Sequence, residues 1–116
     1  MSPAPRMRRV DEAMRQVLGD ALAQDLKDPR VGFVTVTDVK TSPDLRHARV
    51  YVSVLGDEQA REATLAGLRS AHGFLQARVA GELHLKRTPE LRFQYDDTPE
   101  RADRLERLID EGTGAP

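Results

Sequence analysis

The sequence predicts a single α+β domain in which helices cover one face of a three-stranded sheet. Three observations lead to this prediction. Apolar residues recur with helical spacing in residues 10–22 and 65–83. They alternate with polar residues in residues 48–55 and 91–95, as expected for half-buried strands. The chain has 116 residues, which is the ordinary length of one domain and is long enough to bury a hydrophobic core.

The first half of the chain predicts a lead-in, a helix and a β-hairpin. Residues 1–7, which include two prolines, are expected to be a flexible lead-in, and the domain proper is expected to span residues 8–111. The first helix ends before Asp28-Pro29, because a residue that precedes proline avoids helical angles. Residues 31–41 are rich in valine and threonine, which favours a strand. The turn sequence Ser42-Pro43-Asp44 then predicts antiparallel pairing with residues 48–55.

The second half predicts helices around one further strand. Residues 65–83 carry one apolar line that continues past Gly73. Leu91, Phe93 and Tyr95 alternate with polar residues, so a third strand with these side chains facing inward is expected. Thr98 and Pro99 are typical of a helix start, which predicts a C-terminal helix followed by a tail at residues 112–116. The adjacent Asp96-Asp97 is explained by favourable charge at that helix start.

The sequence contains no recognisable catalytic or metal-binding motif. There is no cysteine, no phosphate-binding glycine motif and no serine with a recognisable base and acid. His47, His72 and His84 each lack a second ligand at the usual spacing, so no metal site and no cofactor are expected. The longest apolar stretch, residues 50–55, is too short to cross a membrane, and no signal peptide is visible. We therefore expect a cytoplasmic, non-enzymatic protein.

The charge pattern predicts phosphate contacts on one side of the molecule. The formal net charge is −1, but the chain begins with basic residues and ends with acidic ones. Solvated helices of an arginine-rich protein would explain this pattern as well. The hypothesis is that basic residues on the first helix and around the interruption at Gly73 bind phosphates: Arg8, Arg9, Arg15, Arg69, Arg78, Lys86 and Arg87.

Glycine at position 73 admits two interpretations. It could allow close packing of one continuous helix against the sheet, at a cost of about 1 kcal/mol in helix propensity. Alternatively, Ala71-His72-Gly73 could join two helices at a sharp bend. The small residues would then admit another backbone, and the start of the second helix would favour a phosphate.

The element order α-β-β-α-α-β resembles a type II K-homology (KH) domain. An ordinary KH domain clamps nucleic acid with a G-x-x-G loop between its middle helices, whereas this chain has A-x-G at residues 71–73. That substitution is similar to the ribosome-binding factor A family, and the resemblance covers nearly the whole chain. It is carried by residues 8–39 with the Asp28-Pro29-Arg30 turn, by residues 42–56, and by residues 68–100 with P-E-L-x-F at 89–93 and Tyr95-Asp96.

The resemblance implies a ribosome-assembly function. Members bind the free small (30S) ribosomal subunit near the ends of its 16S rRNA, assist late 5′-end processing, and matter for growth in the cold. They catalyse nothing, and a ribosome-associated GTPase helps their departure. We expect a monomer that contacts RNA through Ala71, His72, Gly73 and the basic residues above. Two alternatives stay open: a KH-like domain not tied to the ribosome, and a protein-interaction module without direct RNA contact.

Overall fold

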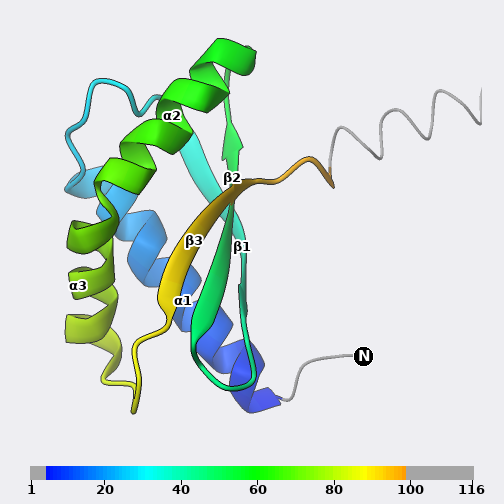
Figure 1. The fold of residues 1–116 in the computed structure, drawn as a ribbon, viewed down its shortest axis with the longest axis vertical. Coiled ribbons are helices and arrows are strands. Elements are labelled where there is room, and N and C mark those ends of the chain that lie inside the picture. The colour runs from blue at the N-terminus through cyan, green and yellow to red at the C-terminus, as the bar shows by residue number, and fades with distance from the viewer. Residues whose placement is uncertain (1–4, 99–116) are drawn as a thin grey trace, which may run out of the picture.

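The helices and strands follow the predicted order. A computed structural model describes residues 5–98. The elements are α1 (Pro5–Gln24), β1 (Val34–Thr41), β2 (His47–Val54), α2 (Glu58–Ser70), α3 (His72–Leu83) and β3 (Glu90–Tyr95). This α-β-β-α-α-β order confirms the expected fold class, and Figure 1 shows the helices gathered on one side of the sheet. The C-terminal helix after Thr98 and the tail at 112–116 lie outside the described residues.

The three strands form one mixed sheet in the order β1-β2-β3. β1 and β2 pair antiparallel, which confirms the hairpin, and β3 joins the other side of β2 in parallel. The inward side chains of β2 and β3 are buried against the helices, as the alternation predicts: Ala48, Val50, Val52, Val54, Leu91 and Phe93. Tyr95 is half-buried, with the Arg61 guanidinium 4.5 Å from its ring centroid. The other face of the sheet carries polar and charged side chains.

Two boundaries differ from the predicted ones. α1 begins at Pro5, so residues 5–7 of the expected lead-in are helical. β1 begins at Val34 rather than at residue 31, because residues 28–32 are attached to α2 instead of to β2. The N–H of Gly32 donates to Oγ1 of the buried Thr64 at 3.4 Å, and Thr64 Oγ1 lies 3.5 Å from the carbonyl oxygen of Arg30.

At each edge of the sheet, one side chain from a helix forms hydrogen bonds with the backbone of the edge strand or of the residue just before it. On the β1 edge, the Thr41 N–H donates to Asp11 Oδ1 at 3.0 Å. On the β3 edge, Gln76 Nε2 donates to the Pro89 carbonyl at 2.6 Å, and the Leu91 N–H donates to Gln76 Oε1 at 3.1 Å. Unpaired edge groups invite pairing with other chains. The two side chains therefore satisfy edge groups while fixing α1 and α3 to the sheet.

Candidate nucleic-acid interface

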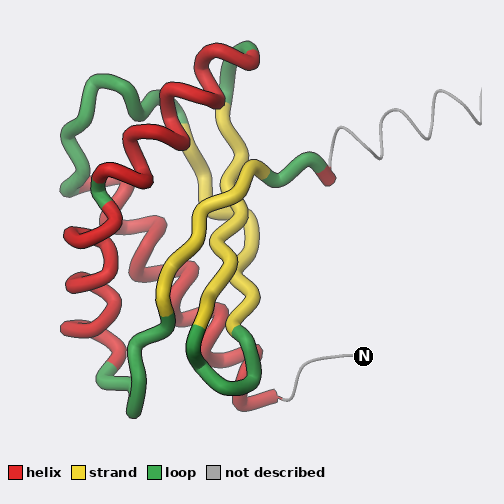
Figure 2. The backbone as a smooth tube through the Cα atoms, in the orientation of Figure 1, coloured by secondary structure: helices red, strands yellow, loops and turns green. Residues whose placement is uncertain are grey.

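The interruption in the second helical segment is a real junction between two helices. Ala71 has φ −87° and ψ 9°, outside the helical region, and it separates α2 from α3 (Figure 2). The bend therefore falls at Ala71 rather than at Gly73. Leu68 and Leu75, on opposite sides of Ala71, are both fully buried, which is why the apolar line runs through the bend without a visible change of period.

Gly73 is not required for packing inside the domain. A Cβ built at Gly73 would have no atom within 4 Å, and the residue is exposed. The close-packing interpretation of Gly73 is therefore wrong. Close packing occurs instead at Gly67, where a Cβ would lie 2.6 Å from Val31 Cγ2. The absence of a side chain at Gly73 leaves open space over the first turn of α3.

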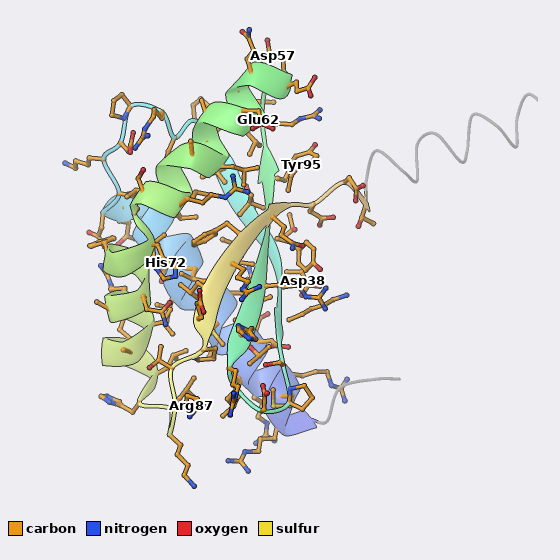
Figure 3. All side chains as sticks on the ribbon, in the orientation of Figure 1. Asp38, Asp57, Glu62, His72, Arg87 and Tyr95 are labelled. Atoms are coloured by element: carbon orange, nitrogen blue, oxygen red, sulfur yellow. The ribbon has the colours of Figure 1, made fainter. Side chains whose placement is uncertain are left out.

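The residues around the junction form a small exposed surface, which we call the junction surface: Arg69, Ala71, His72, Gly73 and Phe74. Arg69 is exposed in the last turn of α2, and His72 is half-buried at the start of α3 (Figure 3). Among the residues that the structure describes, no side chain caps the N-terminus of α3. Phe74 is 45% exposed. Phe74 is not among the candidate RNA-binding residues predicted from the sequence. The signal that could have identified it is that this aromatic residue lies outside the apolar line of Leu68, Leu75 and Val79.

Two of the predicted phosphate-binding arginines have carboxylate partners within the domain. Arg15 donates through Nε to Glu12 at 2.9 Å and forms an ion pair with it. Arg78 lies between two carboxylates, 2.5 Å from Asp25 Oδ2 and 3.2 Å from Glu82 Oε1. Hydrogen bonds to Asp25 and then Glu82 raise the pKa of the Arg78 guanidinium. Because Asp25 follows α1, Arg78 links the end of α1 to α3.

Other predicted residues lie far from the junction. Lys86 and Arg87 follow α3, at the end opposite to the junction, and a helix of this length measures about 18 Å. Figure 3 shows His72 and Arg87 at these two ends. The expectation that Lys86 and Arg87 surround the bend is therefore wrong. They lie at the same end of the molecule as the β1–β2 turn and the start of α1, which carries the exposed Arg8 and Arg9 (Figure 1).

His47, His84 and Asp96 occupy positions that are explained by the fold itself. His47 Nδ1 lies 4.0 Å from Glu90 Oε2, and His84 ends α3 in the left-handed conformation with φ 47°. Asp96 Oδ1 accepts the Thr98 N–H at 2.9 Å, and Asp96 Oδ2 accepts the Thr37 hydroxyl at 2.6 Å. Within residues 5–98, no group of three or more metal-ligating side chains occurs. No helix in this range is long and apolar enough to cross a membrane.

Comparisons with known proteins agree with this architecture. The family model described as ribosome-binding factor A matches residues 6–109. A ribosome-binding factor A from Anaeromyxobacter dehalogenans (strain 2CP-1 / ATCC BAA-258) is 52% identical over 121 residues, covering 100% of this chain and 87% of the relative.

Two structural comparisons also match this fold. One is a solution NMR structure from Thermotoga maritima whose description names ribosome binding factor A. It has a TM-score of 0.72 and 41% identity, and the match covers 81% of this chain and 90% of the other. The second is a homology model of the Thermus thermophilus factor fitted into the cryo-EM map of a 30S complex. It has a TM-score of 0.63 and 30% identity, and the match covers 74% and 90% of the two chains. The chain therefore belongs to the ribosome-binding factor A family.

Proposed function

We propose that this protein binds the free 30S ribosomal subunit by direct contact with its 16S rRNA, and that it assists late maturation of the subunit, including 5′-end processing. The observation that carries the proposal is the junction surface. The relative from Thermus thermophilus, described in a 30S complex, shares this fold, and in the present chain the residue at the junction without a side chain is not needed for packing.

The chemistry of the junction surface suits an RNA backbone. At Gly73 a ribose-phosphate chain can approach the main chain without meeting a Cβ. The N-terminal end of α3 carries the positive end of the helix dipole, which favours a phosphate there. The exposed Arg69 adds a charge, and the exposed ring of Phe74 offers a face to an unpaired base.

The basic residues divide into two groups under this proposal. Arg8, Arg9, Arg69, Lys86 and Arg87 make no ion pair with a described residue, so phosphate binding at these positions breaks no internal bond. Arg15 and Arg78 must give up or share their carboxylates to bind a phosphate. We expect the first group to contribute more to affinity and to its salt dependence.

The mechanism requires binding energy alone. A protein that binds one arrangement of a switchable RNA raises the population of that arrangement by its differential affinity. The proposal is thus a non-catalytic, monomeric, cytoplasmic assembly factor that matters most in the cold, where misfolded RNA pairings escape slowly. The proposal also includes release of the protein by a ribosome-associated GTPase, and this part is supported by the family resemblance alone.

The test compares two glycines of α3 in a sedimentation assay. The full-length protein is centrifuged with free small subunits, large subunits or whole ribosomes over a series of salt concentrations. Gly73→Gln places a side chain on the junction surface. Gly81→Gln is the matched control, because Gly81 is also exposed and a Cβ there also meets nothing within 4 Å.

The expected result is selective, salt-sensitive pelleting with free small subunits. Gly73→Gln should weaken it by about tenfold, the equivalent of about 1.4 kcal/mol, and Gly81→Gln should leave it unchanged. Equal behaviour of the two variants would refute the junction as the contact. Absence of pelleting with any particle at low salt would refute the function. Pelleting without RNA crosslinks would favour the protein-interaction alternative.

A further inference from the structure

The face of the sheet opposite the helices carries a row of three positive charges. The strand register pairs Lys40 with Arg49, and Arg49 with Arg92, so one cation from each strand lies in a single line across the sheet. All three side chains are exposed. Strands lie about 4.8 Å apart, so the row spans about 10 Å at the backbone. We call it the cation row.

The charges of the cation row are not neutralised by carboxylates in the described part of the domain. Like charges directly opposite each other on neighbouring strands destabilise a sheet, and the row contains two such pairs. None of the three cations makes an ion pair with any residue in the described range. The carboxylates of this face lie in the adjacent rows, where Asp38 accepts the Val39 N–H and Glu90 faces His47. Figure 3 shows Asp38 on the side of the sheet away from α3.

An aromatic ring lies beside the cation row. Tyr51 is two residues from Arg49 on β2, on the same face, and is half-buried. The Lys40 ammonium lies 5.8 Å from the centroid of its ring, within cation–π distance. Proteins that bind single-stranded nucleic acid combine cations for the backbone with aromatic rings on which bases stack. Tyr51 and the cation row place both groups on one face of the sheet.

We propose that the cation row and Tyr51 form a second RNA-binding surface, which takes a single-stranded segment different from the one at the junction. The inference rests on the proposed function in one respect, which is that the ligand is RNA. Phosphates would contact Lys40, Arg49 and Arg92, and one base would stack on Tyr51. A polyanion fits better than an ordinary protein surface, because a nucleic-acid backbone supplies a phosphate for each of the three adjacent cations. A protein holding both surfaces would fix two RNA segments relative to each other.

The test uses an oligouridylate of about twelve nucleotides and the full-length protein. The chain has two tyrosines and no tryptophan, so Tyr95→Phe leaves Tyr51 as the only strong emitter. Its fluorescence is followed during titration with the oligonucleotide. In parallel, Arg49→Gln and Arg92→Gln are made in the otherwise unchanged chain. Lys27→Gln serves as the matched loss of one exposed charge in the loop after α1.

Oligouridylate should quench Tyr51. Each arginine variant should weaken binding and lower the salt slope by about 0.7 log units, and Lys27→Gln should change neither. Because Tyr51→Ala removes the emitting ring, its binding is measured by filter retention of labelled oligouridylate, as is that of the charge variants. Tyr51→Ala should weaken this binding by about tenfold. Binding that leaves Tyr51 and the arginine variants unaffected, or no binding, would overturn the inference. If Arg49→Gln weakened pelleting with small subunits but not oligonucleotide binding, the row would bind a ribosomal protein, and the inference would also fail. In each case the Gly73→Gln and Gly81→Gln comparison decides the proposed function separately.

Discussion

The helices on either side of the junction and the junction itself are held very differently. Where α2 packs on residues 28–31, a Cβ at position 67 would lie 2.6 Å from Val31 Cγ2. The Gln76 amide of α3 bonds the Pro89 carbonyl just before β3 and the Leu91 N–H within β3. Between these two anchors, a Cβ at Gly73 would meet no packing neighbour within 4 Å among the described residues. The rigid supports thus fix where the junction is, while its surface stays open. Binding sites are often built in this way, with exposed binding residues held in place by a well-packed scaffold.

The largest effect should come from removing the anchor of α3. Gln76→Ala leaves the Leu91 N–H and the Pro89 carbonyl without their partner, and both residues are almost completely buried. We expect the free energy of unfolding to fall by about 2–3 kcal/mol, measured by urea denaturation. Gln16→Ala, an exposed glutamine on α1, is the control and should change stability by less than about 0.5 kcal/mol. Equal effects would show that the amide contributes nothing.

The anchor of α2 should have the next largest effect. Gly67→Ala gains about 1 kcal/mol in helix propensity but forces a methyl group against Val31. We expect a net destabilisation of about 1–2 kcal/mol. Adding Val31→Ala makes room for the methyl group, so a double-mutant cycle should show a favourable coupling of about 1 kcal/mol. Simple additivity would mean that the contact does not limit the packing.

The junction should respond with the opposite sign. Gly73→Ala is expected to raise the free energy of unfolding by about 0.5–1 kcal/mol, because it adds helix propensity where nothing is displaced. Gly81→Ala should give a similar gain, since its surroundings are equally open. Thermal and urea denaturation of both variants test this. A loss of stability in Gly73→Ala alone would indicate a constraint on the backbone at the junction.

The smallest effect concerns the pH dependence of the segment beneath Gly67. Hydrogen bonds from the Arg30 side chain and then from its backbone lower the pKa of Asp28. A carboxylate with a lowered pKa stabilises the fold above its ordinary pKa, and this contribution disappears as the pH falls below about 4. The urea midpoint of the wild type should therefore fall more steeply in acid than that of Asp28→Asn. Parallel curves would show that Asp28 does not contribute.

The sequence alone was sufficient for the order of the elements from α1 to β3 and for the hairpin, because hydrophobic periodicity and turn chemistry are local signals. It could not identify which glycine packs closely, because the close contact at Gly67 comes from Val31 in a distant part of the chain. The bend was equally hidden, because Leu68 and Leu75 keep one apolar line through it. The cation row depends on strand register: alternation predicted that Arg49 and Arg92 point outward, but only the parallel pairing of β2 with β3 aligns them.

That parallel pairing also has a consequence for the order of folding. The β1–β2 hairpin closes over a short turn, whereas His47 meets Glu90 only after both α2 and α3 have intervened. Contacts between residues distant along the chain form slowly, because their loop-closure entropy must be lost first. During synthesis the hairpin can therefore form well before the third strand leaves the ribosome. Completion of the sheet, and with it the alignment of Arg92 beside Arg49, is therefore expected to be a late step in the folding of each newly synthesised chain.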